Sequence, residues 1–292
     1  MGAYSKPDRQ PCGVQHIAIG EAVVSVVNDG THPVDFPDLV TTEPEACEKA
    51  HRDAFCIVPP SLTISCFVIR SGGRLVLVDT GFGSKTPATG RLLHNLRSIG
   101  IAPDDIDTVL MTHMHQDHDA GLVDSAGKPV FTRAELVLHE NEYAFWGNDG
   151  ERARATGTRF VEFGLAEAAF AAYGERLRTV SNGEVLPGIR AVPTPGHTPG
   201  HTAWLVDSGR DALLIWGDII HFPGIQFAIP DASVAFDHDS AAAALARRKV
   251  LAFAAGEKLR VAGVHLDFPA FGHVVTEGSA YRFIPEIWRP VL

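Results

Sequence analysis

Short apolar runs alternate along the chain with longer segments whose apolar residues recur at helical spacing. Apolar runs bounded by Gly, Pro or Asp favour strands, whereas a period near 3.6 residues favours helices. The pattern predicts strands at 17–27, 65–70, 74–81, 108–112, 134–139, 188–194, 202–207, 212–218 and 259–265. It predicts helices at 86–99, 159–173 and 239–255. Strands and helices that alternate in this way indicate a fold of the α/β class.

Residues 28–60 interrupt the alternation. They are rich in Pro, Asp and Thr and show no clear period. A long excursion of this kind within a compact domain usually has a function of its own. We interpret it as a cap over the site or an arm of a homodimer, attached to a single domain that spans residues 1–292.

Four predicted strands end in a residue that can bind or support a metal ion. The runs LVLVD, TVLMTH, LLIWGD and RVAGVH end at Asp79, His113, Asp218 and His265. Strands that deliver polar groups at their carboxyl ends place them along one rim of a sheet, where α/β folds build their sites.

The composition of the chain narrows the classes of binding partner. The chain has 292 residues, 45% of them hydrophobic, and a formal net charge of −10. An acidic surface repels phosphate backbones and anionic lipids, which argues against nucleic acid and membrane partners. The first residues form no apolar signal segment, and no apolar run approaches membrane-spanning length. Cys12, Cys47, Cys56 and Cys66 form no CxxC pair, so free thiols in a cytoplasmic protein are expected, with a disulfide in an exported form as the alternative.

The run THMHQDH at 112–118 carries the densest chemistry. Its potential ligands are His113, His115, Asp117 and His118. Imidazole and carboxylate suit zinc and its first-row neighbours. His113 and His115 alternate, so on an extended backbone they point the same way, whereas Asp117 and His118 follow the turn and can face a second ion.

Three later segments add further candidates. His197 lies in the Gly/Pro loop PGHTPGH, Asp218 ends the run WGD, and His265 ends the last predicted strand. His273 is the rival of His265, but it does not end a predicted strand. A single zinc is satisfied by about four ligands, so these residues exceed the needs of one ion.

The motif His-x-His-x-Asp-His, followed by a Gly-His loop, Gly-Asp and a late His, resembles the metallo-β-lactamase superfamily, as does Asp79-Thr80-Gly81 upstream. The resemblance covers roughly residues 16–275. The tail HLDFPAFGH and the segment WGDIIH look most like the branch of methyl parathion hydrolase and its lactonase relatives. The resemblance implies a four-layer αββα sandwich, an α/β (α+β) fold with two facing mixed sheets between outer helices.

The resemblance also implies two divalent metal ions, zinc first and iron, manganese or cobalt as alternatives. Carried over position by position, it gives one metal to His113, His115 and His197, and the second to Asp117, His118 and His265, with Asp218 as the bridge. Five neutral imidazoles and two carboxylates around two such ions leave a charge of +4 − 2 = +2, and a bridging hydroxide lowers this to +1. Such a site lowers the pKa of water from 15.7 towards ~7.

The implied activity is a hydrolase in which this hydroxide attacks the ester or lactone carbonyl of a small molecule, with phosphotriesters as a side activity. The candidate catalytic residues are Asp117, Asp218 and His221. On the family pattern His221 faces the pocket and could donate a hydrogen bond to the substrate or the leaving group, with a structural imidazole as the open alternative. Aromatic residues could line the pocket or belong to the core: Phe82, Trp146, Phe222, Phe227 and Phe236.

Other interpretations remain open. Asp79 is better explained as a group that orients a ligand imidazole than as a ligand, and His201 is divided between such a role and loop packing. A thioesterase or a β-lactamase shares the fold, although the best-known β-lactamase subclass has Cys in place of Asp218. A non-catalytic, metal-stapled binding protein is the alternative of a different class, but structural zinc sites are usually closed and rich in thiolates.

Overall fold

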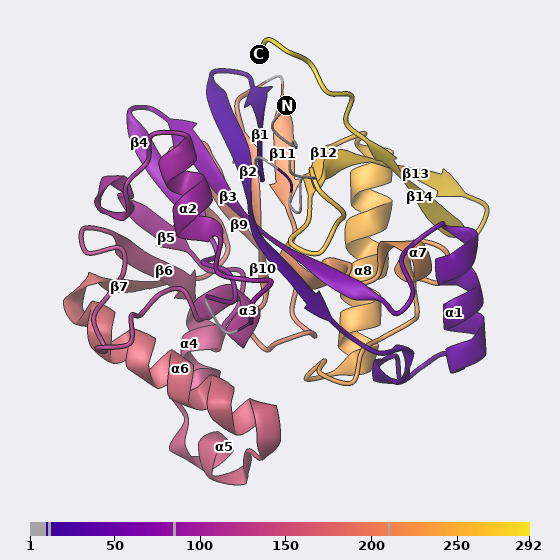
Figure 1. Cartoon of the computed structure of the whole chain (residues 1–292), viewed down its shortest axis with the longest axis horizontal. Helices are drawn as coiled ribbons and strands as arrows, with labels where there is room; N and C mark the ends of the chain where they lie inside the picture. Colours follow the sequence, from indigo (N-terminus) through magenta and orange to yellow (C-terminus); the bar gives the residue numbers. More distant parts are fainter. Residues whose placement is uncertain (1–9, 11–12, 84–85, 210) are drawn as a thin grey trace, which may run out of the picture.

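In the computed structural model, the described residues form two seven-stranded mixed sheets that pack face to face (Figure 1). The structure describes residue 10 and residues 13–83, 86–209 and 211–292. The first sheet contains, in order, β1 (Val14–Ile19), β2 (Ala22–Pro33), β3 (Ser61–Ser71), β4 (Arg74–Val78), β5 (Thr108–Leu110), β6 (Glu135–His139) and β7 (Leu177–Val180). The second contains β14 (Ala280–Pro285), β13 (Phe271–Glu277), β12 (Arg260–Ala262), β11 (Ala212–Ile215), β10 (Thr202–Asp207), β9 (Ile189–Pro193) and β8 (Gly183–Leu186).

Helices cover the outer faces of both sheets, which completes the predicted αββα sandwich (Figure 1). The α-helices of the described residues are α1 (Pro44–Asp53), α2 (Leu92–Ser98), α3 (Gln116–Asp119), α4 (Glu140–Trp146), α5 (Asp149–Arg154), α6 (Gly157–Tyr173), α7 (Pro223–Gln226) and α8 (Ser240–Gly256). Short 3-10 helices are η1 (Phe36–Asp38), η2 (Pro103–Asp105), η3 (Gly174–Arg176) and η4 (Gly217–Ile219). Helices α2 and α6 pack on the first sheet and α8 on the second.

Strand β3 illustrates why both faces of the first sheet are apolar. Phe67 and Ile69 lie in the core between the sheets, whereas Cys66 and Val68 lie under α2 and α6. Successive side chains of a strand point to opposite faces, so a strand covered on both sides is a continuous apolar run. The central strands are therefore the ones that the sequence pattern predicts best.

The predicted strand at 17–27 is wrong in one respect, because a tight turn divides it into β1 and β2. Gly20 occupies the turn with a φ of +57°, a conformation that glycine adopts without a steric penalty. Ile19 pairs with Ala22, so apolar residues flank the turn on both sides. The apolar pattern therefore runs through the turn and hides it.

The predicted helix at 86–99 begins only at Leu92, and Asp29 supplies the reason. Its carboxylate accepts hydrogen bonds from the backbone N–H groups of Leu92, at 2.9 Å, and of Gly90, at 3.2 Å. Asp29 belongs to β2, so the spacing of apolar residues within 86–99 cannot indicate where the helix begins. The helices α6 and α8 are confirmed to within two residues at their ends.

Residues 28–60 fold against the rest of the same chain. Strand β2 continues to Pro33, η1 follows, and α1 packs beside α7. Leu39 and Cys47 from this segment share a small apolar core with Phe222 and Ile225. Its interpretation as a cap or a dimer arm stays a prediction.

Among the described residues, none of the helices combines the length and apolar character needed to cross a bilayer. Cys47, Cys56 and Cys66 are free thiols. Cys12 and the N-terminal residues that argue against a signal segment lie outside the described part of the chain.

Candidate metal centre

The predicted metal residues meet at the ends of central strands in both sheets. His113 and His115 follow β5, and His115 directly precedes α3, which carries Asp117 and His118. His197 lies in the loop between β9 and β10, Asp218 in η4 after β11, and His265 after β12. Because β4 with β5 and β11 with β12 are parallel pairs, these ends lie on one side of the sandwich.

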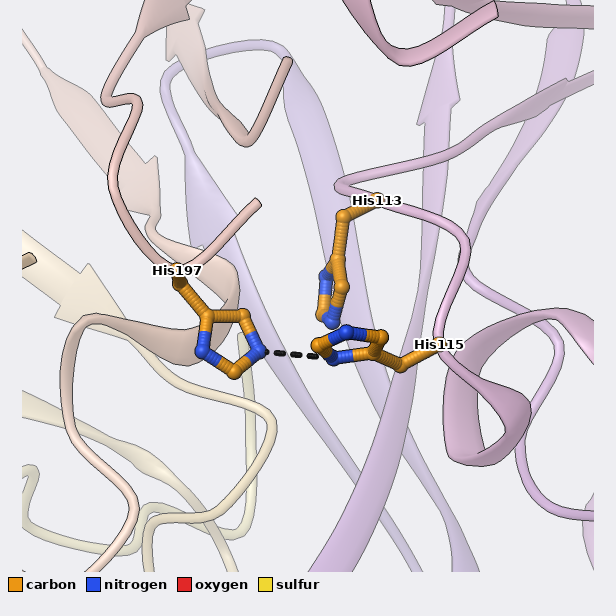
Figure 2. A group of neighbouring side chains, drawn as sticks. All are labelled: His113, His115 and His197. Carbon is orange, nitrogen blue, oxygen red and sulfur yellow. Dashed lines mark hydrogen bonds between the residues drawn. The ribbon is translucent and has the colours of Figure 1, made fainter. Parts of the chain in front are cut away.

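Three imidazoles form the first group of potential ligands (Figure 2). His115 Nδ1 and His197 Nε2 are 2.9 Å apart, and the His113 ring lies 4.7 Å from each of the other two rings. Each residue offers one nitrogen to a set that spans no more than 4.8 Å. All three side chains are buried.

Asp117, His118 and His265 form the second group, within the same 4.8 Å limit. Asp117 Oδ1 lies 3.7 Å from His118 Nε2, and its Oδ2 lies 3.5 Å from His265 Nε2. His273 does not join them, because it lies on β13 with its Nε2 3.7 Å from Glu286. The structure therefore brings together all seven predicted ligands and leaves the rival imidazole outside.

Asp218 lies between the two groups. Its Oδ1 is 3.2 Å from His118 Nε2, and its Oδ2 is 3.2 Å from the Nε2 atoms of His197 and His265. Gly217 makes this position accessible: it has a φ of +56°, and a Cβ there would lie 2.7 Å from His201 Nε2. One carboxylate can thus face both groups at once.

The chemistry of these atoms fits a bound metal. Without hydrogen-bond partners, the buried Nε2 atoms of His113 and His118 and the Oδ1 atom of Asp218 would each carry a desolvation cost of about 1–3 kcal/mol. Their convergence on one volume removes that cost if a cation accepts their lone pairs. Imidazole and carboxylate donors without thiolate are those of hydrolytic zinc sites.

Outer hydrogen bonds fix the orientation of the imidazoles. Asp79 Oδ2 contacts His118 Nδ1 at 2.9 Å, Asp237 Oδ1 contacts His197 Nδ1 at 2.8 Å, and the Thr63 carbonyl contacts His265 Nδ1 at 2.7 Å. Such contacts hold a ligand ring in one orientation and tautomer. The sequence singled out Asp79 alone, since Asp237 and Thr63 belong to no recognisable motif.

His201 acts on the site through the backbone. Its Nε2 accepts the N–H of Asp218 at 3.0 Å, and its Nδ1 contacts Thr194 Oγ1 at 2.8 Å. Burial lowers the pKa of His201 to about 3, so the ring remains a neutral acceptor. The sequence left His201 between a supporting role and loop packing. The structure places it behind Asp218, where it supports that residue.

Electrostatics prepare the ligands for a cation. Burial alone would raise the pKa of the Asp218 carboxyl, but the imidazoles of His118 and His265 bring it well below its usual value. Burial, assisted by the neighbouring imidazoles, holds the pKa values of His113 and His115 well below the ordinary histidine value. Burial acts in the same direction on His118, His197 and His265, but Asp218 raises the pKa of each above the ordinary histidine value, so metal binding at these three rings displaces protons.

A cavity of about 350 Å³ opens onto both groups. Phe82, Phe236 and Leu62 form its apolar wall, and Asp35, Asp38 and Glu162 are carboxylates on its lining. Among the described residues that line it there is no Lys or Arg.

The structure divides the five candidate aromatic residues between the cavity and the core, the two positions that the sequence left open. Phe82 and Phe236 line the cavity, but three other aromatic residues belong to the core. Phe222 lies in the small core beneath α1, Phe227 stacks on Phe283 at 5.7 Å, and Trp146 packs on Phe163 at 4.8 Å.

His221 lines the cavity and contacts the central carboxylate. Its Nε2 lies 3.0 Å from Asp218 Oδ2, so the imidazole donates its Nε2–H to that oxygen. The Gln226 side chain accepts the backbone N–H of His221 at 2.7 Å and fixes this position.

Comparison with known proteins agrees with this architecture. A family model described as the metallo-beta-lactamase superfamily matches residues 60–265. The N-acyl homoserine lactonase AiiA of Bacillus thuringiensis subsp. kurstaki is 20% identical over 246 residues, which cover 77% of this chain and 87% of that protein.

Two solved structures are similar over nearly the whole chain. The hydrolase AbOPH of the beta lactamase superfamily superposes with a TM-score of 0.91 at 25% identity, covering 96% of this chain and 100% of that one. AidC, described as a dizinc quorum-quenching lactonase, superposes with a TM-score of 0.88 at 27% identity, covering 95% and 98% of the two chains.

Proposed function

The chain belongs to the metallo-β-lactamase superfamily, and we propose that within it the protein is a two-metal hydrolase of neutral esters and lactones. The observation that carries this proposal is the position of Asp218, whose carboxylate contacts ligands of both groups: Oδ2 lies 3.2 Å from His197 and from His265, and Oδ1 lies 3.2 Å from His118. A single-ion site leaves no reason for a carboxylate to be surrounded in this way.

The proposed first metal is held by His113, His115 and His197, and the second by Asp117, His118 and His265, with Asp218 shared. Zinc is the preferred ion, supported by the donor set and by the dizinc description of AidC, with iron, manganese or cobalt as alternatives. When bound, the ions supply a hydroxide nucleophile at neutral pH and stabilise the oxyanion that develops during attack.

The residues of the chain contribute position and shape. Asp79, Asp237 and the Thr63 carbonyl orient three ligand rings. His221 and His201 hold Asp218 from its side chain and its backbone. The constellation is therefore fixed before substrate arrives, which is the condition under which electrostatic stabilisation is most effective.

The cavity favours an uncharged substrate. Its lining carries the carboxylates of Asp35 and Asp38 and no cationic side chain among the described residues. Glu162 also lines it, but burial raises the pKa of this acid to about 7, and Arg159 lies 3.6 Å from it, so it adds little negative charge. Lactones and aryl esters meet this condition, and so do phosphotriesters as a side activity. The lactonase names of AiiA and AidC support the first of these classes.

Metal content and turnover test the proposal together. We expect elemental analysis to give two equivalents of divalent metal per chain, because both ligand groups are complete. Removal of metal by a chelator should abolish hydrolysis of a chromogenic aryl ester, and zinc should restore it. A stable single equivalent with full activity would contradict the two-metal assignment and place the group of Asp117, His118 and His265 in doubt.

His221→Ala tests the role of the cavity imidazole. Because its Nε2–H is used by Asp218, we expect kcat/KM to fall by about 10- to 100-fold, equally for an aryl ester and an alkyl lactone. An aryloxide needs little protonation on departure, so a selectively larger loss on the alkyl lactone would instead show that His221 assists the leaving group. His51→Ala, which removes a buried imidazole outside the cluster, is the matched control.

A further inference from the structure

Glu142 is a buried acid in α4 that none of the proposed ligand or supporting roles uses. Glu142 is 0% exposed. Among the described residues, no Lys, Arg or His forms an ion pair with it. A carboxylate in this position requires several hydrogen bonds to offset the loss of water. Burial raises the pKa of Glu142, and the hydrogen bonds that it accepts act in the opposite direction.

Four donors from three segments meet at this carboxylate. Oε1 accepts the backbone N–H of Met114 at 2.9 Å and Trp146 Nε1–H at 2.6 Å. Oε2 accepts the hydroxyl of Thr198 at 2.7 Å and the backbone N–H of Gly200 at 2.9 Å. Both oxygens are thus fully used inside the protein, and neither is directed at the metal groups.

The donors flank the ligands of the proposed first metal. Met114 lies between His113 and His115 after β5, and Thr198 directly follows His197 in the loop between β9 and β10. These segments belong to different sheets, and Glu142 is bonded to both. The indole of Trp146 also packs edge-on against the His115 ring, with centroids 5.8 Å apart.

The loop between β9 and β10 packs closely against α4. A Cβ on Gly200 would lie 2.2 Å from the backbone nitrogen of Glu142, so only glycine allows the loop to approach the helix this closely. The loop therefore meets Glu142 through its backbone as well as through Thr198.

We propose that Glu142 is a positioning residue that holds the His113–His115 segment and the His197 loop in register, so that their three imidazoles reach one metal ion. This inference rests on the proposed metal site. Glu142 bonds to the backbone on both sides of the gap between the sheets. Asp79 bonds to Thr112 and His118 on one side only, and Asp237 and the Thr63 carbonyl each contact one ligand ring.

Glu142→Gln removes this function with little change in shape. The amide retains one acceptor oxygen, but its NH₂ group cannot accept the two donors that face the other oxygen. Either the Met114 side or the Gly200 side then loses its partner. The first metal site should become looser, while the second, which Glu142 does not touch, should remain intact.

Chelator competition with zinc on the full-length protein measures this effect. We expect one of the two equivalents to bind about 10- to 100-fold more weakly in Glu142→Gln, with the other unchanged. Glu135→Gln is the matched control, because it neutralises an acid on the adjacent β6 that pairs with Arg178 at 2.8 Å and contacts neither loop. Leu138→Ala, a buried β6 variant, controls for loss of stability and should leave both affinities unchanged.

The outcomes distinguish the role of Glu142 from the two-metal function on which it rests. A wild-type protein that binds fewer than two ions would contradict the proposed function. Two ions in the wild type, with both affinities within twofold of it in Glu142→Gln, would overturn the role of Glu142 alone. If Glu142→Gln does not fold, Thr198→Val takes its place: it removes one of the four donors, and we expect a smaller loss at the same single equivalent. Unchanged affinity there would likewise overturn the proposal.

Discussion

Asp218→Asn is expected to lose nearly all hydrolytic turnover, by about 1,000-fold or more, which corresponds to about 4 kcal/mol in the barrier. The wild-type carboxylate faces His118 on one side and His197 and His265 on the other, all at 3.2 Å. The amide removes the negative charge between two proposed cations and replaces one acceptor oxygen with a donor. Metal affinity should fall with activity, since a neutral group is a poor bridge.

The measurement is kcat and metal content for the variant in excess zinc. Asp211→Asn provides the control, because Asp211 precedes the other end of the same strand, β11, and pairs with Arg260 at 2.7 Å. It should retain near wild-type activity. A metal-replete Asp218→Asn protein with undiminished turnover would show that Asp218 is not the bridge.

Local signals predict the α/β class and most of the ligand cluster, whereas the two-sheet sandwich follows from the family resemblance that the ligand motifs carry. The central strands are apolar on both faces, and the ligands of the first run lie within a few residues of one another. His197, Asp218 and His265 follow strand ends, which the fold then brings to one side. His265 could be preferred over His273 for this reason.

The supporting contacts could not be predicted, because they join distant parts of the chain. Asp237 is 40 residues from His197, and Thr63 is 202 residues from His265. Glu142 lies in a short helix whose pattern gives no sign of its four donors. The same limit applies to β13 and β14 at the margin of the second sheet. No clear alternation marks them, and they are defined by pairing, β13 with β12 and β14 with β13.

Substrate charge is the second property for which we expect a large effect. The carboxylates of Asp35 and Asp38 line the cavity, with no Lys or Arg among its described lining residues. At an effective dielectric constant of about 20, two like charges about 8 Å apart repel by about 2 kcal/mol. A β-lactam carries a carboxylate away from its reacting carbonyl and meets this repulsion. A phosphodiester carries its charge at the phosphorus centre, beside the two proposed cations, whose positive charge offsets part of the repulsion.

We therefore expect kcat/KM for a lactone or an aryl ester to exceed that for nitrocefin by about 100-fold, and that for a phosphodiester by less. Repulsion of about 2 kcal/mol from each of two carboxylates corresponds to about 1,000-fold, and solvent screening of these partly exposed groups reduces it. Asp38→Asn should raise the rate on nitrocefin by about threefold, because a partly exposed charge is screened by salt, and should leave the aryl ester unaffected. Parallel measurement of all four substrates at low and high salt provides the test. A wild-type protein that cleaves nitrocefin faster than any lactone or aryl ester would overturn the substrate class, while two bound metal ions would still support the hydrolytic site itself.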